Sequence, residues 1–347
     1  MSDTRTHAEI PMKTIGPVAI TGPVLAGAVS IPLASLERPL WPSTNRGAKV
    51  SRACGGIRVV IVDERMSRSL LFEARTVVEA VEAKESMESR LTDVAAVVEA
   101  STRYGKFRGL NFQVLGRLLY IRLEMRTGDA AGHNMVTLAA DRLATWLGRE
   151  YPQLAYVSIS GNYCTDKKAS AVNGILGRGK YAVAEIEISE RICADLLKTT
   201  PAKIADLNTK KNLLGTMLAG GVRTANAHYA NILLAFYLAT GQDAANIVEG
   251  SQGITFAEVR DGGLYFSVTI PNIIVGTVGS GKGLPYVREN LELLGCTEER
   301  PAGENARRLA AICAAAVLCG ELSLMAAQTN PGELMRAHTA FERRADD

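Results

Sequence analysis

A cluster of charged residues in an otherwise uncharged loop is the segment of this sequence best suited to catalysis. Residues 161–170, GNYCTDKKAS, place Asp166, Lys167 and Lys168 in succession between uncharged neighbours. An acid beside a lysine in a glycine-bounded loop can hold an ammonium group against a developing oxyanion. A solvated charged turn is the ordinary alternative, but the uncharged residues on both sides favour a loop that is partly buried.

Two further glycine-bearing segments could bind phosphate groups. Residues 128–135, GDAAGHNM, join a predicted strand to a predicted helix, so their amides could face an anion or simply form a turn. Residues 276–283, GTVGSGKG, nearly match the P-loop pattern, but Gly283 stands where a magnesium-binding hydroxyl belongs. A P-loop nucleotidase is therefore disfavoured, whereas a glycine-rich loop beside a pyrophosphate is compatible. No Rossmann fingerprint follows a first strand, so a dinucleotide would use another fold.

Three single residues are candidates for proton transfer. Glu37 lies in SLERPLWPSTNRG, Asp243 in TGQDAANIVEG and His338 in LMRAHTAFERR. Each residue type can donate or accept a proton near a reacting group. Taken alone, each is more often a solvated or satisfied polar group, and their spacing in the sequence does not show that they converge.

The elements that position these residues follow from the periodicity of apolar side chains. Residues 1–67 alternate short apolar runs with Gly and Pro, which predicts strands and loops, and residues 69–99 predict a long helical stretch. Further strands are predicted at 118–126, at the start of 157–180, at 182–188 and twice near 252–275, and a helix at 134–147. A helix–strand–helix block at about 75–158 thus separates two segments of different character. This pattern predicts one domain inserted into another.

Composition excludes several classes of protein. The 347 residues carry a net charge of +3 without a clustered basic block, which argues against a nucleic-acid partner. The six cysteines form no CxxC pair and the four histidines are scattered, so we expect no metal site and reduced, cytoplasmic thiols.

Two uncharged stretches could be mistaken for membrane spans. Residues 15–36 contain Pro17, Pro23 and Pro32, which would interrupt a spanning helix, so short strands are expected instead. Residues 224–242 include asparagine and histidine side chains and predict a buried helix. We therefore expect a soluble, cytoplasmic protein with no membrane partner.

Taken together and in order, the segments resemble the 3-hydroxy-3-methylglutaryl-CoA (HMG-CoA) reductase family from about residue 31 to residue 343. The segments that carry the resemblance are STNRGAKVSR after Glu37, TGDAAGHNM, SGNYCTDKKASAVNGILGRGK, KKNLLGTMLAGG, NAHYAN, TGQDAANIVEGSQ, IVGTVGSGKG and ENARRLAAICAAAVLCGELSLMAA. The sequence is similar to the class I type, in a short soluble bacterial form without a membrane anchor.

The resemblance implies an α+β fold of two domains. A large CoA-substrate-binding domain, residues 1–74 and 170–347, would surround a long central helix. A small ferredoxin-like α/β domain that binds NADP, residues 75–158, would be inserted in it, with residues 159–169 as the connecting catalytic loop. Active sites would form between the subunits of a homodimer, from which higher oligomers could be built.

The resemblance also implies a reaction. The family reduces HMG-CoA to mevalonate and CoA with two NADPH, through a mevaldyl-CoA hemithioacetal and mevaldehyde, in the mevalonate pathway of isoprenoid biosynthesis. Lys167 would stabilise the oxyanion, His338 would protonate the CoA thiolate, and Glu37 would supply the proton for aldehyde reduction. Asp243, close to Glu37 and Lys167, would keep Glu37 protonated by like-charge repulsion.

Binding roles follow by matching positions to the family. The positions that match substrate contacts are Ser160, Asp166, Lys168 and Asn231, the last near Lys167. The positions that match cofactor contacts are Asn45, Thr102, Arg103, Asp129, Gly132, Asn134, Val278, Gly279, Ser280 and Gly281. Thr102 and Arg103 fall where the family places a hydroxyl and an arginine against a 2′-phosphate, which favours NADPH over NADH.

Two departures from the family pattern keep alternatives open. Arg38-Pro39 replaces the usual glycine after the catalytic glutamate, and Glu73 stands where a substrate-binding arginine is common. Arg68 or Arg75 would have to make that contact instead. The alternatives are a reductase of a different acyl-CoA and a non-catalytic CoA-binding relative, the latter disfavoured because all four catalytic positions are filled.

Overall fold

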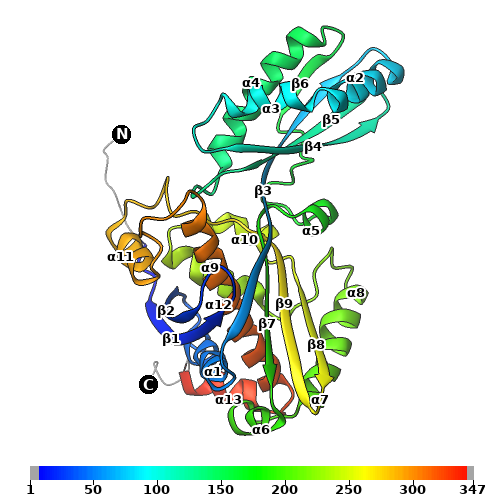
Figure 1. The fold of residues 1–347 in the computed structure, drawn as a ribbon. Coiled ribbons are helices and arrows are strands. Elements are labelled where there is room, and N and C mark those ends of the chain that lie inside the picture. Colours follow the sequence, from blue (N-terminus) through cyan, green and yellow to red (C-terminus); the bar gives the residue numbers. More distant parts are fainter. Residues whose placement is uncertain (1–7, 342–347) are drawn as a thin grey trace.

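The computed structural model describes residues 8–341, and these form two sheets that share one strand (Figure 1). The first sheet has the strand order β2-β1-β3-β7-β9-β8. Its strands are β1 (Met12–Thr21), β2 (Gly27–Ala34), the first half of β3 (Ile57–Glu73), β7 (Gly179–Ile188), β8 (Ile254–Arg260) and β9 (Gly263–Ile273). All neighbours are antiparallel except β1 and β3, which pair in parallel over a short stretch.

The second sheet has the order β4-β5-β3-β6 and carries its own core. Its elements are the second half of β3, α2 (Val77–Ser89), α3 (Leu91–Glu99), β4 (Lys106–Leu115), β5 (Leu118–Arg126), α4 (His133–Glu150) and β6 (Ala155–Ile159). The chain order strand–helix–strand–strand–helix–strand is that of a split βαβ motif. Apolar faces of the helices pack on Leu70, Phe72 and Ile121, all fully buried.

Strand β3 connects the two units and corrects one prediction. Residues 58–65 pair with β7, whereas residues 66–73 pair with β5 and, over 70–73, with β6. The second core thus begins at Met66, while the predicted division of the chain fell after residue 74. The prediction of helix from residue 69 is wrong for 69–73, because an apolar run this short fits either element and pairing on both sides decides for the strand.

Helix α1 (Leu40–Ala53) was also not predicted, since residues 1–67 read as strands and loops. Its position depends on helix α12 (Glu304–Gln328), against which it packs. A Cβ on Gly47 would lie 2.2 Å from the carbonyl oxygen of Cys319, so only glycine allows the two backbones to approach this closely. The STNRG segment is therefore a helix–helix contact as well as a candidate binding segment.

Helix α12 is the centre of the larger core. By length and composition it could cross a membrane, but 94% of its most apolar window is buried inside the protein. It packs against α1, the first sheet and helix α9 (Tyr229–Ala239), whose buried apolar residues confirm the predicted helix within 224–242. The long central helix that the family resemblance implied is thus a core element.

The remaining elements are short. They are α5 (Ala171–Leu176), α6 (Glu190–Ile192), η1 (Cys193–Leu197), α7 (Pro201–Leu207), η2 (Asn208–Gly215), α8 (Thr216–Leu218), η3 (Ala244–Asn246), α10 (Ile247–Gly250), α11 (Pro285–Leu293) and α13 (Glu333–Phe341). The predicted strands at 118–126, 182–188 and 252–275 and the predicted helix at 134–147 are confirmed.

Candidate active site

The loop between β6 and α5 carries the charged cluster of Asp166, Lys167 and Lys168 in a strained conformation. Asn162, Thr165 and Lys167 have φ angles of 59°, 47° and 55°. The left-handed region costs about 1–2 kcal/mol for each residue that has a Cβ. Such a conformation persists only where the surroundings over-determine it. Contacts from outside the loop must therefore hold it.

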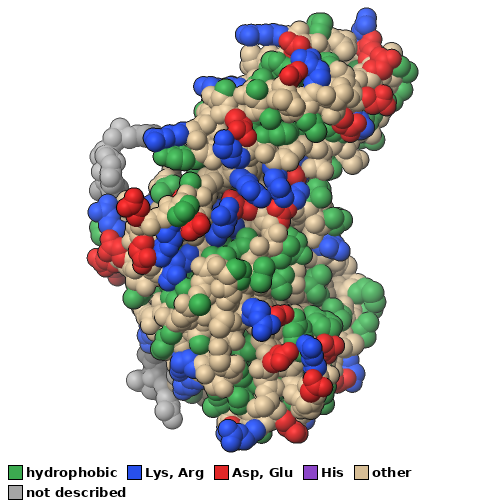
Figure 2. All heavy atoms as spheres, viewed as in Figure 1, with side chains coloured by type: hydrophobic (Ala, Val, Ile, Leu, Met, Phe, Trp, Pro, Cys, Tyr) green, Lys and Arg blue, Asp and Glu red, His purple; other side chains and the backbone are tan. Residues whose placement is uncertain are grey.

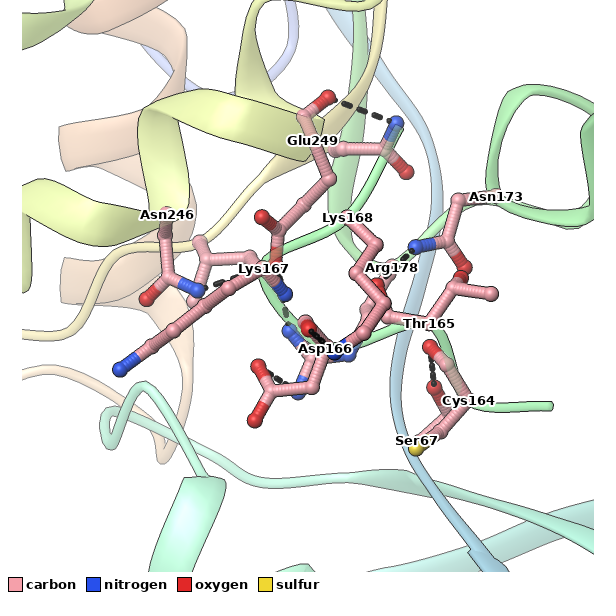
Figure 3. A network of polar contacts seen from close by, with 12 residues as sticks. Ser67, Cys164, Thr165, Asp166, Lys167, Lys168, Asn173, Arg178, Asn246 and Glu249 are labelled. Atoms are coloured by element: carbon pink, nitrogen blue, oxygen red, sulfur yellow. Dashed lines mark hydrogen bonds and ion pairs between the residues drawn. The ribbon is translucent and has the colours of Figure 1, made fainter. Parts of the chain in front are cut away.

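A buried ion pair between Arg178 and Glu249 provides these contacts (Figure 3). Both side chains are fully buried, and Arg178 Nη1 donates to Glu249 Oε1 at 2.8 Å. The same oxygen accepts the backbone N–H of Lys167 at 3.1 Å. Arg178 Nη2 lies 3.0 Å from Asp166 Oδ1, close enough for an ion pair although outside hydrogen-bond geometry. Burial raises the pKa of Glu249, and the charge of Arg178 opposes that rise.

Lys167 and Asp243 form the pair that the catalytic proposal needs. Lys167 Nζ lies 2.7 Å from Asp243 Oδ2, with both side chains about two-fifths exposed. The hydrogen bond to Asp243 raises the pKa of Lys167 above its ordinary value, against the effect of burial. Burial would raise the pKa of Asp243, but the bond to Lys167 outweighs it and lowers that pKa. The ammonium is thus charged and held in place at neutral pH.

This pair faces a cavity of about 450 Å³ between the two glycine-bearing segments. Five predicted cofactor positions line it, namely Gly132, Asn134, Val278, Gly279 and Ser280. The two segments meet directly, since Thr277 N–H donates to the carbonyl oxygen of Asp129 at 2.8 Å. Residues predicted to bind cofactor and residues predicted to catalyse therefore share one cavity.

The donors around this cavity suit a phosphorylated dinucleotide. The first turn of α4 faces it, and helix N-termini present free amides to anions. Three cations also line it, Arg68, Lys167 and Lys282. A Cβ on Gly279 would meet no atom within 4 Å, so the loop leaves open space for a ligand. Arg68 Nε is buried without a partner among the described residues.

Asp129, predicted as a cofactor contact, has a structural contact in this fold. Its two carboxylate oxygens accept the backbone N–H groups of Gly303 and Ala306, each at 2.9 Å. It therefore caps the N-terminus of α12 and shapes the cavity through its backbone. Gly281 also does not line the cavity, because its backbone packs on Gly241.

Thr102 and Arg103 lie in the turn between α3 and β4, beside the cavity. Thr102 Oγ1 accepts the backbone N–H of Gly105 at 3.2 Å. A Cβ on Gly105 would touch both Thr102 and Met135, so this turn lies against the first turn of α4. Arg103 is exposed, with its guanidinium group 5.1 Å from the ring centre of Tyr104. Arg103 does not line the cavity itself, but its turn lies against the first turn of α4, which does.

Glu37 lines a second cavity of the chain, apart from the cavity that Lys167 and Asp243 line. Its Oε2 accepts a hydrogen bond from Asn231 Nδ2 at 2.8 Å. Asn231 is in the first turn of α9, whereas Asp243 follows the end of that helix. An α-helix rises 1.5 Å per residue, so Asn231 lies about 12 Å along α9 from its last residue, Ala239. Within one chain Asn231 thus contacts Glu37 rather than the surroundings of Lys167, and Asp243 is not next to Glu37.

The second cavity, about 390 Å³, differs in character from the first. Glu37, His228 and Asn231 line one part of it, and Leu324 and Ala327 of α12 supply apolar surface. Asn45 lies in neither cavity: its Oδ1 accepts the backbone N–H of Gly16 at 3.0 Å, and it lines a third hollow beside Lys13. A direct cofactor contact of Asn45 with the first cavity is therefore not formed by one chain.

The predicted substrate residues of the catalytic loop are close together. Ser160 Oγ lies 3.1 Å from Cys164 Sγ and accepts the N–H of Asn162 at 3.0 Å. Lys168 is exposed, and its Nζ donates to the backbone oxygen of Asp166 at 3.1 Å.

The structure also decides between the arginines considered for the departure at Glu73. Glu73 pairs with Arg117 at 2.7 Å on the second sheet, away from the cavity lining. Arg75 is exposed and pairs with Glu79. Arg68 lines the cavity and lies 3.5 Å from Asp166. Of these two arginines, only Arg68 lines the cavity.

Several residues at the site were not among the predicted positions. They are His133, Arg178, Gln242, Glu249 and Lys282. Four of them lie in segments that carried the family resemblance: Arg178, Gln242, Glu249 and Lys282. Their charged or amide groups stand within apolar or glycine-rich sequence, and this pattern could have identified them as site residues. Burial, and then the positive charge of Arg178, lower the pKa of His133 below its ordinary value. The side chain of His338 lies outside the described residues.

Comparisons with known proteins agree on one family. The profile of the family described as "Hydroxymethylglutaryl-coenzyme A reductase" matches residues 4–343. Proteins named 3-hydroxy-3-methylglutaryl-coenzyme A reductase from Aeropyrum pernix, Pyrococcus horikoshii and Methanocaldococcus jannaschii are 45%, 44% and 42% identical to this chain. Each alignment covers 96% of this chain and 80%, 81% and 82% of the respective relative.

Solved structures agree at the level of the fold. The class II 3-hydroxy-3-methylglutaryl-CoA reductase from Streptococcus pneumoniae, bound to NADPH in open conformations, is similar with a TM-score of 0.74 and 18% sequence identity. The match covers 95% of this chain and 88% of that one. At this identity the likeness supports the mixed α+β fold alone.

Proposed function

The chain belongs to the hydroxymethylglutaryl-coenzyme A reductase family, and we propose that the Lys167–Asp243 pair is the centre at which it reduces HMG-CoA. The reaction converts HMG-CoA, two NADPH and two protons into mevalonate, free CoA and two NADP⁺. The observation that carries the proposal is a charged, fixed ammonium at a cavity whose glycine-rich walls suit a dinucleotide.

The chain's own groups have separate tasks in this scheme. NADPH, when bound, supplies the hydride for both reductions. Lys167 stabilises the negative charge that develops on the thioester oxygen and later on the aldehyde oxygen. When the C–S bond of the hemithioacetal breaks, CoA leaves as a thiolate, and His338 is proposed to protonate it. Glu37 is proposed to donate the proton that completes mevalonate.

The substrate's free carboxylate requires a cation beside the reacting group. Arg68 supports this role because it lines the cavity and its Nε is buried without a partner among the described residues. Arginine binds carboxylates through paired N–H donors. The loop between β6 and α5 also carries Ser160, Asp166 and Lys168, and we propose that they contact the hydroxymethylglutaryl group.

NADPH is the proposed cofactor in preference to NADH. Arg103 is exposed beside the first turn of α4, and its guanidinium group is free among the described contacts apart from Tyr104. A 2′-phosphate would offer it two oxygens, while the 2′-hydroxyl of NADH would offer no charge.

We further propose that two chains complete each active site. Glu37 and Lys167 belong to cavities at opposite ends of α9, so one chain does not bring both to the same substrate. Apolar side chains gather on the face that carries α5 and α8 (Figure 2), where Ile175, Met217 and Leu218 are 60%, 69% and 86% exposed. Such a patch marks an interaction surface. A second copy on this face could bring its catalytic loop to the Glu37 cavity.

A spectrophotometric assay tests the proposed function. Purified protein is mixed with HMG-CoA and with a panel of other acyl-CoA thioesters, each with NADPH or NADH, and oxidation of the nicotinamide is followed. We expect two equivalents of NADPH oxidised for each HMG-CoA. Preference for another thioester would support a different acyl-CoA reductase, and binding without oxidation would indicate a non-catalytic relative.

A further inference from the structure

The glycine-rich loop 276–283 and the turn that carries Asp243 are packed together as one backbone unit. Gly241 and Gly281 have φ angles of 62° and 85°, and a Cβ on either would lie 2.8 Å from the carbonyl oxygen of the other. Neither position accepts a side chain without separating the two segments. This contact joins a predicted cofactor loop to the end of helix α9.

Gln242 makes a second connection between the same segments. Its side-chain amide donates to the carbonyl oxygen of Gly276 at 3.1 Å and accepts the N–H of Gly276 at 3.0 Å. Gly276 in turn packs against the GDAAGHNM segment, because a Cβ there would lie 2.3 Å from the N atom of Ala131. The turn after α9 is therefore fixed to both walls of the cavity.

Lys282 is the charged member of this connection and has no role in the proposed mechanism. Its Nζ donates to the carbonyl oxygens of Thr240, at 3.2 Å, and of Gly241. These carbonyls lie at the C-terminal end of α9, where helices leave acceptors unpaired and where positive charge is favoured. Lys282 also lines the cavity of Lys167.

We propose that Lys282 is a positioning residue for the reduction: its ammonium fixes the turn after α9 so that Asp243 holds Lys167 in place. The inference rests on the proposed function, because it assigns a task within that reaction. Asp243 follows Gly241 by two residues and caps η3 through a hydrogen bond from the N–H of Ala245 at 3.1 Å. The position of Gly241 therefore determines the orientation of the Asp243 carboxylate.

The charge state of Lys282 supplies a measurable signature. Burial lowers the pKa of Lys282 to about 8. The other charged or titratable side chains lining the cavity are Arg68, His133, Asp166, Lys167 and Asp243. Below its pKa Lys282 is an ammonium that binds both carbonyls strongly, and above it the charge is lost. The hydrogen bonds from Lys282 to the two carbonyl oxygens should therefore weaken as the pH rises through about 8. Lys167 does not lose its charge in this range, because its pKa is raised above the ordinary lysine value.

The experiment compares Lys282→Met and Lys282→Arg with the wild-type protein. We expect Lys282→Met to lower kcat by up to about 100-fold, the effect of a displacement of roughly 1 Å in a catalytic group, with a smaller change in KM for NADPH. Lys282→Arg should recover much of this loss. The matched control is Lys84→Met, which removes a lysine from the surface of α2 and should keep wild-type rates.

A pH profile separates positioning from a general structural role. In wild type, kcat/KM for NADPH should fall above pH 8, and in Lys282→Arg this limb should move to higher pH because arginine stays charged. If Lys282→Met does not fold, this comparison alone decides the inference. Identical profiles in wild type and Lys282→Arg would overturn it.

The kinetics also distinguish failure of the proposed function from failure of the Lys282 role. A wild-type protein that does not reduce HMG-CoA at all would contradict the proposed function. An active wild type with an unchanged kcat in Lys282→Met would contradict only the role of Lys282. A rise in KM for NADPH alone would make Lys282 a cofactor contact and would likewise overturn the positioning role.

Discussion

Lys167 and Lys168 are neighbours in the chain but have different surroundings. Lys167 Nζ is paired with a carboxylate at 2.7 Å, which fixes the ammonium in space. Lys168 Nζ reaches only a backbone oxygen at 3.1 Å and is exposed. A preorganised cation can stabilise a transition state without rearranging, so Lys167 fits the oxyanion and exposed Lys168 remains available to bind the substrate carboxylate.

Alanine substitution should therefore separate the two lysines. We expect Lys167→Ala to lower kcat roughly a hundred- to a thousandfold with HMG-CoA and with added mevaldehyde alike, since an oxyanion forms in both reductions. Lys168→Ala should mainly raise KM for HMG-CoA. Steady-state kinetics on both substrates provides the measurement, and near-normal turnover by Lys167→Ala would refute its role.

Asp243 should determine the titration of Lys167. The hydrogen bond from Lys167 to Asp243 is the largest cause of the raised pKa of Lys167, and burial acts in the opposite direction. In Asp243→Asn the charge partner is lost while burial stays, so the pKa of Lys167 should fall. NMR titration of ¹³C-labelled lysine, with Lys167→Ala to assign the signal, measures this shift. Equal midpoints in wild type and Asp243→Asn would contradict the coupling.

At the scale of elements, the position of helix α12 depends on a cap from a distant segment. Gly303, at its N-terminus, has a φ angle of 92° and provides no capping side chain. Asp129 supplies both acceptors instead, from the loop before α4. One carboxylate thus joins the central helix of the first core to the cavity wall at the start of the second.

Removing this cap should destabilise the protein. We expect Asp129→Ala to lower the free energy of unfolding by about 1–2 kcal/mol, the usual cost of deleting an N-cap side chain. Asp141→Ala is the matched control, because Asp141 is exposed on α4 and makes no side-chain hydrogen bond or ion pair among the described residues. Urea denaturation measures both. Equal stability of the two variants would show that the cap contributes little.

At the scale of the whole molecule, the separation of Glu37 from Lys167 makes a prediction about assembly. If each site takes Glu37 from one chain and Lys167 from its partner, two inactive variants can complement each other. In a heterodimer of Glu37→Gln and Lys167→Ala, one of the two sites would contain both native residues.

Co-expression of these two variants tests the shared site. Random pairing makes half of the dimers mixed, each with one intact site of two, so we expect about a quarter of wild-type activity. Each variant expressed alone should be nearly inactive. If both residues acted within one chain, the mixture would be no more active than its components, and the shared site would be rejected.

The sequence by itself determined the types of residue available for chemistry and much of the local structure. The acid–lysine cluster, the two glycine-bearing segments and the strands at 118–126 and 182–188 depend on neighbouring residues, whose periodicity and turn propensity are local properties. The same order of segments carried the family resemblance. Short apolar runs such as 69–73 and the amphipathic stretch that forms α1 fit more than one element, so local pattern did not settle them.

Only the tertiary structure decided which of these residues meet. Lys167 is fixed by Glu249, 82 residues away, and Glu37 by Asn231, 194 residues away. The family resemblance implied that Asp243 lies close to Glu37 and Lys167. Within one chain, Asn231, which contacts Glu37, and Asp243 lie at opposite ends of α9. Asp129 caps α12 from a segment that lies 174 residues before Gly303 in the chain. Such outcomes depend on contacts between distant segments, and these form only when the whole core packs.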